Sequence, residues 1–302
     1  MWDDADVTRG AGRQARDVGT ALLFLLPSLL LFTAFVFFPL GKTIYLSLFF
    51  TSPQGNPRVF AGLDQYLELF ASPVFHAGLV ATFWFVALSV PAGIALALVL
   101  ATLANRRVRG INVFRTAMVS TIAVSAAVGS LIWLMLFNPS LGLLNYLLSL
   151  VGLRGLNWLT EPSVAIVAVS ITTIWLSLGF SIIILLAGLQ GVPEELYEAA
   201  KIDGASPALM FQRITVPMLT PFLFFLLVVN TIHVFQAFTQ IHLLTRGGPV
   251  DATRTLVYSI YLDAFHNFQF GYASAQSLVL FAIILVLTVI QFAFVEKRVH
   301  YQ

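Results

Sequence analysis

Long apolar runs alternate with short polar segments along the whole chain. A helix that crosses a bilayer needs about 20 mostly apolar residues, and six runs satisfy this requirement. The pattern therefore predicts six membrane-spanning helices, at residues 20–48, 78–104, 111–137, 164–189, 217–243 and 275–295. The segments between them are too short for a separate folded unit, so residues 1–302 are expected to form a single transmembrane domain.

The composition supports a membrane protein over a soluble one. Hydrophobic residues make up 59% of the 302 residues and charged residues only 10%, whereas a soluble domain carries about 25% charged residues. The fold class predicted is therefore an all-α membrane protein. Because the chain is so apolar, membrane lipid is an expected partner. The net charge is only +2, so the basic pI does not indicate a nucleic-acid partner. The absence of cysteine excludes disulfides and thiolate metal sites.

Positive side chains fall mainly on one side of the predicted spans, and this bias sets orientation in membranes. One side holds Arg9, Arg13, Arg16, Arg106, Arg107, Arg109, Arg115, Lys201, Arg213, Lys297 and Arg298. The other holds Lys42, Arg58, Arg154, Arg246 and Arg254. The distribution predicts that both termini are cytoplasmic, with residues 1–19 as a cytoplasmic N-terminal segment and 190–216 as a cytoplasmic loop.

The first apolar run admits a second interpretation, a cleaved signal peptide, because arginines precede it. It is far longer than a signal core of about 7–15 residues, and no clear small-residue cleavage site follows it. A retained helix is therefore predicted.

The loop at 190–216 is the most polar internal segment and carries four acidic residues within ten positions. Pro193 suits the first turn of a helix, and Gly204 can adopt the left-handed conformation that ends one. Ser206 can cap a second short helix with Pro207 at its first position. The loop is thus predicted to be a rigid bracket of two helices, suited to contact with a soluble partner; an ordinary solvated loop is the alternative.

The spacing within this loop is long and specific: Glu198-Ala199-Ala200, three residues, Gly204, nine residues, then Ile214-Thr215-Val216-Pro217. It resembles the coupling loop of permease subunits of bacterial ABC importers, with Val216 in place of the usual leucine. The resemblance implies the type I ABC importer permease fold. It also implies that an ATP-binding subunit is contacted by Glu198, Ala199, Ala200, Asp203 and Gly204.

Other segments resemble the carbohydrate-uptake class of these permeases: residues 60–66, 136–139, 244–249 and 271–275. The tail at 294–302 is similar to that of the first permease subunit of glycerol-3-phosphate and glycerophosphodiester importers. One departure is Ser120-Thr121, where many relatives carry Leu-Pro, and it leaves the bend of the third span open.

The resemblance implies a complex in the bacterial cell membrane. Its partners would be a second homologous permease, two ATP-binding subunits that hold the ATP and Mg²⁺, and an extracytoplasmic solute-binding protein. The implied solute is a glycerophosphodiester such as glycerophosphocholine, or sn-glycerol-3-phosphate. A sugar or oligosaccharide such as trehalose or maltose is the alternative.

Polar residues at membrane depth mark candidate contacts with a solute. On a continuous helix, Asn230, His233, Gln236 and Gln240 of the fifth span would lie within an arc of about 120°. This stripe suits a passage for a polar solute, and hydrogen bonding between helices is the alternative. By the resemblance, Trp175, Ser177 and Phe180 of the fourth span also line the path, and Ser125 of the third is a weaker candidate.

Catalytic signatures are absent from the sequence. Gly41-Lys42-Thr43 imitates the end of a phosphate-binding loop, but Val36 replaces the required glycine. No His-Glu-x-x-His spacing or metal cluster is present, so the chain is predicted to bind no cofactor or metal and to be no enzyme. An ion-coupled secondary transporter would carry acidic residues within its spans, and the predicted spans contain none.

Overall fold

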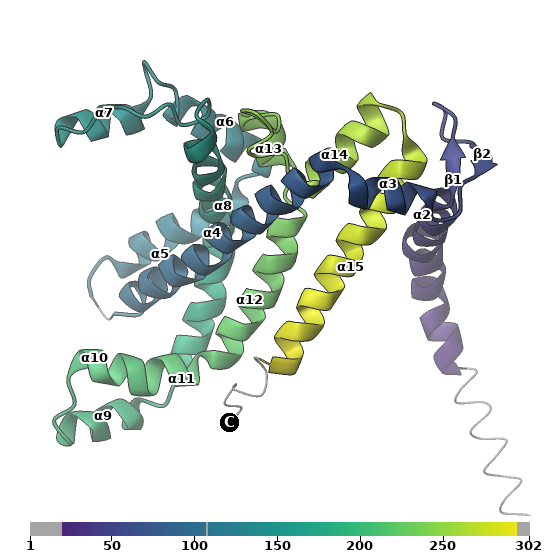
Figure 1. The fold of residues 1–302 in the computed structure, drawn as a ribbon. Coiled ribbons are helices and arrows are strands. Elements are labelled where there is room, and N and C mark those ends of the chain that lie inside the picture. The colour runs from purple at the N-terminus through teal and green to yellow at the C-terminus, as the bar shows by residue number, and fades with distance from the viewer. Residues whose placement is uncertain (1–19, 107, 295–302) are drawn as a thin grey trace, which may run out of the picture.

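The computed structural model describes residues 20–106 and 108–294 of the chain. Residues 1–19 and the C-terminal residues 295–302, which are predicted to be cytoplasmic, lie outside the described residues. The helices in chain order are η1 (Thr33–Phe37), α2 (Phe38–Ser47), α3 (Asp64–Ala71), α4 (Pro73–Ala104), α5 (Ile111–Val119), η2 (Ser120–Ala123), α6 (Ala126–Leu136), α7 (Leu143–Leu150), α8 (Pro162–Gln190), α9 (Glu194–Ile202), α10 (Pro207–Met210), η3 (Phe211–Thr215), α11 (Val216–Met218), α12 (Thr220–Phe235), α13 (Thr239–Leu244), α14 (Leu256–Tyr261), η4 (Leu262–His266) and α15 (Phe270–Phe294). Figure 1 shows their arrangement.

Four helices in the described part are long and apolar enough to cross a membrane: Thr20–Ser47, Pro73–Ala104, Pro162–Gln190 and Phe270–Ala293. They correspond to the first, second, fourth and sixth predicted spans. Two bent pairs of shorter helices cover the third and fifth, which raises the number to six if each pair counts as one span. The third and fifth predicted spans are therefore present as bent pairs of helices.

The third predicted span is bent by 108° between residues 111–123 and 126–136. Val124 and Ser125 are extended, and the Ser125 hydroxyl accepts a hydrogen bond from Val128 N (3.3 Å). Ser125 therefore acts as the N-cap of α6, which satisfies a backbone donor at the start of the new helix.

The fifth predicted span is bent by 65° between residues 207–218 and 220–235. Pro221 has no backbone donor for the carbonyl of Pro217, four residues earlier. The Thr220 hydroxyl donates to that carbonyl instead (2.6 Å). The span also ends early, because α12 stops at Phe235 and the chain turns before α13.

The core of the helical body is the packing of α4 against α8. Gly93, Ala97 and Ala101 recur every fourth residue of α4, so they share one face, and the two alanines are fully buried. Small residues allow membrane helices to approach closely. They meet large side chains of α8 such as Ile182 and Leu185, which are also fully buried.

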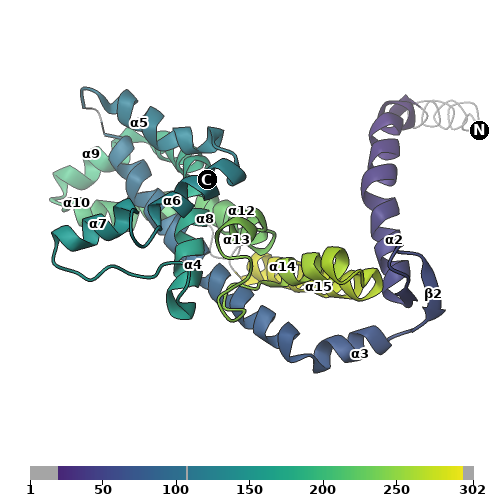
Figure 2. The same cartoon turned by 90° about the horizontal axis from the view of Figure 1, so that it is seen from above.

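The N-terminal helix stands apart from this body, as Figures 1 and 2 show. Its C-terminal part, α2, packs against α15, but none of its most apolar stretch is buried within the chain. A π-helical turn, η1, lies just before Pro39 of α2. Such a turn can accommodate a proline, which has no backbone N–H to donate within the helix.

A small antiparallel hairpin, β1 (Phe49–Thr51) with β2 (Pro57–Phe60), adds strands to the predicted all-helical fold. It connects the N-terminal helix to α3. Gln65 of α3 is buried and donates to the carbonyls of Ser47 (2.8 Å) and Phe49 (3.0 Å). Gly271 at the start of α15 donates its amide to the Thr51 hydroxyl (3.1 Å), and a Cβ there would meet the Phe49 carbonyl. Residues 60–66 and 271–275, far apart in sequence, thus meet at one junction.

Candidate functional site

The predicted bracket forms as two short helices beyond the ends of the spans, at the lower left of Figure 1. Its first helix, α9, begins at Glu194, with Glu194 and Glu195 in its first turn and Lys201 in its last. Both placements oppose the partial charges of the helix ends, which stabilises a short exposed helix. Pro193 precedes the helix rather than occupying its first turn.

Gly204 ends this helix as predicted, with φ at +75°. Its amide donates to the carbonyl of Lys201 (3.1 Å), and the amide of Ala205 donates to that of Ala200 (2.9 Å). This pair of bonds is the Schellman motif, which satisfies carbonyls at a helix C-terminus and requires a left-handed residue at the position of Gly204.

The second half of the bracket also follows the prediction. The Ser206 hydroxyl accepts a hydrogen bond from Leu209 N (3.3 Å), and Pro207 is the first residue of α10. A further contact was not predicted: the hydroxyls of Tyr197 and Thr215 lie 2.9 Å apart. Because Thr215 is buried where the bracket returns to the membrane, this contact fastens α9 to the base of the fifth span.

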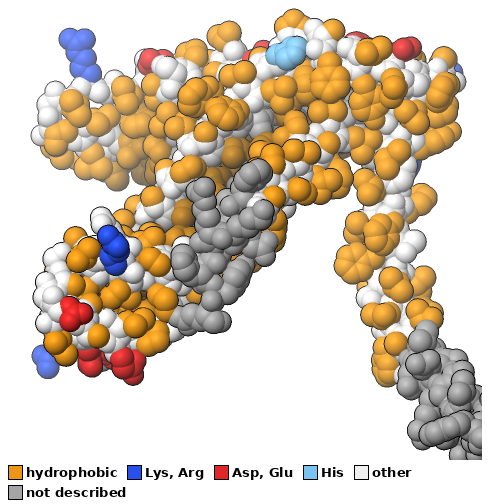
Figure 3. Space-filling view, turned by 60° about the horizontal axis from the view of Figure 1, so that its bottom comes forward, with side chains coloured by type: hydrophobic (Ala, Val, Ile, Leu, Met, Phe, Trp, Pro, Cys, Tyr) orange, Lys and Arg blue, Asp and Glu red, His pale blue; other side chains and the backbone are white. Residues whose placement is uncertain are grey.

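The surface of the bracket is exposed, acidic and partly apolar. Glu198, Ala199, Asp203 and Gly204 are exposed and Ala200 is half-buried. Ile202, beside them, is 87% exposed. Figure 3 shows acidic side chains gathered over the α9–α10 lobe. Exposed apolar and charged groups on a capped, rigid element suit docking of a protein with basic groups.

The three candidates on α8 are half-buried. The Trp175 ring makes an edge contact with Trp133 of α6 (6.2 Å between centroids), and the Phe180 ring lies 6.5 Å from that of Phe225 on α12. The Ser177 hydroxyl donates to the carbonyl of Ile174 within its own helix (3.0 Å). These side chains therefore connect α8 to α6 and α12 and are only partly accessible to a solute.

Asn230 is buried, at 4% exposure, and its Nδ2 donates to the Ser181 hydroxyl of α8 (3.3 Å). Its Oδ1 has no hydrogen-bond partner among the described residues. The hydrogen bond between α12 and α8 fits the alternative in which Asn230 links two helices. The unpartnered Oδ1 leaves one acceptor for a solute or water.

The stripe predicted on the fifth span does not exist as one helical face, because the helix ends before its last two members. His233 is exposed on α12, Gln236 is exposed directly after it, and Gln240 is buried in α13. Aromatic rings pack around α13, and Phe238 stacks on Tyr258 there. Burial raises the pKa of the Tyr258 hydroxyl. The prediction that the four residues share an arc was wrong.

The sequence did not predict one contact at Ser120-Thr121, the position where many relatives carry Leu-Pro. The Thr121 hydroxyl accepts a hydrogen bond from the backbone amide of Gly179 in α8 (3.0 Å). A Cβ on Gly179 would lie 2.6 Å from that hydroxyl and 2.8 Å from the Val119 carbonyl. The bend of the third span is thus pressed against the middle of α8, directly beside Phe180.

The sequence pattern of the family described as "Binding-protein-dependent transport system inner membrane component" matches residues 89–301. Among curated proteins, the chain is similar to the sn-glycerol-3-phosphate transport system permease protein UgpA of Agrobacterium fabrum, with 39% identity over 92% of this chain and 95% of that protein. The protein of the same name from Brucella abortus is 40% identical over 92% of this chain and 94% of its own length.

Solved structures agree on the fold. A chain of a bacterial ABC transporter involved in the import of the acidic polysaccharide alginate superposes with a TM-score of 0.80, 25% identity, and coverage of 94% of this chain and 99% of that one. A bacterial alginate ABC transporter in complex with an alginate pentasaccharide-bound periplasmic protein gives a TM-score of 0.81 at 23% identity, covering 94% and 96%. The predicted type I ABC permease fold is confirmed. The chain belongs to the family of inner-membrane components of binding-protein-dependent transport systems, as a multi-pass ABC permease.

Proposed function

We propose that this chain is one of two permease subunits of an ATP-driven importer and forms half of the path for sn-glycerol-3-phosphate or a glycerophosphodiester such as glycerophosphocholine. The observation that carries the proposal is the 39–40% identity, over 92% of the chain, to permeases named for sn-glycerol-3-phosphate transport. The family match at residues 89–301 includes the bracket.

The bracket supports ATP-binding subunits as the source of energy. It presents Glu198 and Asp203 on a capped helix beside the exposed Ile202. Tyr197 ties it to the base of α11 and α12 through Thr215, so a displacement of α9 is transmitted to a membrane helix. Two such subunits, one for each permease, would bind the ATP and Mg²⁺, and a solute-binding protein would deliver the solute from outside.

The N-terminal helix supports a second permease. Its most apolar stretch is unburied in this chain, and Figure 3 shows apolar side chains covering it. A second permease can pack against this face as well as against the half-buried path residues of α8. In the assembled path, we assign solute contacts to Trp175, Ser177, Phe180, Asn230, His233, Gln236 and Gln240.

A sugar or oligosaccharide remains the second candidate solute, because the structurally similar alginate importer has a polysaccharide as its named substrate. The predicted spans also carry no Lys or Arg at mid-membrane, where a phosphate group would gain most from one. A positive group would then have to come from His233, from the second permease or from the binding protein.

Purification of the chain in mild detergent, with mass spectrometry of what accompanies it, tests the assembly. We expect an ATP-binding protein, a second permease and a solute-binding protein. Uptake of radiolabelled sn-glycerol-3-phosphate, glycerophosphocholine and maltose by the reconstituted complex then tests the solute. Transport by the chain alone without ATP would refute the proposal in favour of a secondary transporter.

A further inference from the structure

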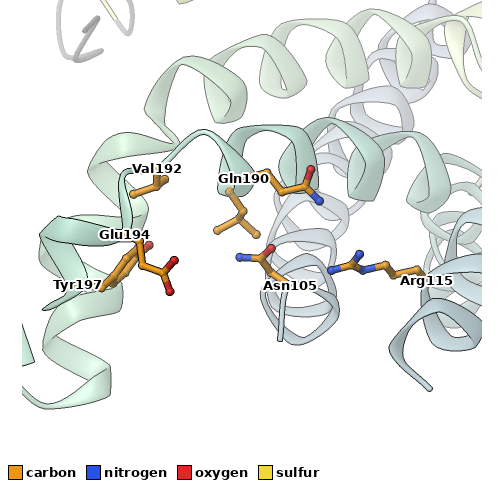
Figure 4. Close-up of a pocket in the computed structure, with 7 residues that line it drawn as sticks. Asn105, Arg115, Gln190, Val192, Glu194 and Tyr197 are labelled. Atoms are coloured by element: carbon orange, nitrogen blue, oxygen red, sulfur yellow. The ribbon is translucent and has the colours of Figure 1, made fainter. Parts of the chain in front are cut away.

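A cavity of about 720 Å³ lies where the second and fourth spans end, between the α4–α5 corner and the base of α9. Its volume lies within the range of about 300–1,000 Å³ that is typical of small-molecule sites. It is separate from the docking face of the bracket and from the path residues. Figure 4 shows the side chains that line it, which come from α5, α8, α9 and the segments that follow α4 and α8.

Hydrogen-bond donors gather on one wall of this cavity. Arg115 of α5 donates from Nε to the carbonyl of Ala104 (2.8 Å), which holds the guanidinium in place and leaves its terminal nitrogens for another acceptor. In Figure 4 the guanidinium points toward the amide of Asn105, with Gln190 nearby. A planar guanidinium with neighbouring amides matches the several oxygens of a phosphate group.

The surroundings add positive charge beside the ends of the second and fourth spans. Arg106 and Arg109 are exposed on the loop between α4 and α5. Basic pockets between membrane helices on the cytoplasmic side are suited to anionic headgroups. Glu194 and Tyr197 line the opposite wall.

We propose that this cavity binds one phosphate group from the cytoplasmic side, held by Arg115 with Asn105 and Gln190. The group is supplied either by an anionic phospholipid headgroup or by a soluble phosphate compound. Because the cavity touches both the α4–α5 corner and α9, the bound group lies between the membrane-embedded helices and the bracket. The site is independent of which solute the importer carries.

Two binding measurements on the purified complex distinguish the sources. In the first, native mass spectrometry compares retention of phosphatidylglycerol with that of phosphatidylcholine. In the second, equilibrium dialysis measures binding of orthophosphate and of sn-glycerol-3-phosphate to the complex in neutral-lipid nanodiscs. Each is repeated with Arg115→Gln and with Arg109→Gln, a matched loss of charge on the loop just before α5 and outside the residues that line the cavity.

We expect Arg115→Gln to weaken binding in one of the two measurements roughly 10- to 100-fold, as charge-assisted hydrogen bonds are lost, while Arg109→Gln changes it about twofold at most. Loss in the lipid measurement assigns the site to a headgroup, and loss in the dialysis assigns it to a soluble anion. Absence of binding in both, or equal weakening by both variants, overturns the proposal. If Arg115→Gln does not assemble, Gln190→Leu decides: weaker binding supports the site, and unchanged binding refutes it.

Discussion

The conformation of Gly204 makes a sharp prediction about how the bracket works. Its φ of +75° costs any residue with a Cβ about 1–2 kcal/mol, which reduces the population of the native bracket roughly 5- to 30-fold. No heavy atom lies within 4 Å of the position that a Cβ would occupy. Within this chain the penalty is therefore one of backbone conformation and not of space.

A series at this position separates conformation from the size of the docking face. Asparagine adopts left-handed backbone more readily than alanine but is larger, and a β-branched residue adopts it least. If the conformation decides, uptake should fall in the order Gly204, Gly204→Asn, Gly204→Ala, Gly204→Val. If the size of the contact face decides, Gly204→Asn should be worse than Gly204→Ala.

The assay is ATP-driven uptake by the reconstituted importer, with the amount of ATP-binding subunit that co-purifies as a second readout. Gly191→Ala is the matched control, because Gly191 is exposed in the same loop but has a φ of −83°; we expect it to behave as wild type. Wild-type uptake and co-purification for Gly204→Ala and Gly204→Val would refute the reasoning.

Three further substitutions test other contacts. Gly179→Ala would place a Cβ 2.6 Å from the Thr121 hydroxyl oxygen of η2. It should destabilise the protein by about 1–3 kcal/mol, measured as a lower melting temperature in detergent. The control is Gly41→Ala, where nothing lies within 4 Å of the added Cβ, and it should leave the melting temperature unchanged. Tyr197→Phe removes the hydroxyl that pairs with Thr215. It should weaken the attachment of α9 by about 1 kcal/mol and lower the amount of solute taken up per ATP hydrolysed. An unchanged ratio of uptake to ATP hydrolysis would show that the contact transmits nothing. His233→Ala should lower uptake of a phosphate-bearing solute at unchanged complex assembly, and unchanged uptake would remove His233 from the path.

The bracket was predictable from the sequence because each of its devices acts over a few residues. The left-handed glycine, the serine cap and the proline at a helix start depend on backbone bonds to neighbours within about five positions. Ser206 and Gly204 therefore perform in the structure the roles that their spacing indicates. Four of the six spans were predictable for a similar reason, since the length of an apolar run alone sets whether a helix can cross the bilayer.

The path could not be read from the sequence in the same way. The arc predicted for Asn230, His233, Gln236 and Gln240 assumed one continuous helix, and the turn after Phe235 breaks that assumption. Whether a polar side chain faces a passage or another helix depends on what lies opposite, and for Asn230 that is Ser181, 49 residues away.

The sequence by itself determined the membrane class of this protein, its apolar segments and the conformation of its bracket, because these follow from hydrophobicity and local backbone geometry. Only the tertiary structure decided where two spans bend, that the bend at Thr121 is held by the Gly179 amide 58 residues away, and that a cavity with Arg115 on its wall opens beside the bracket. These features arise from packing between distant segments, which no local pattern encodes.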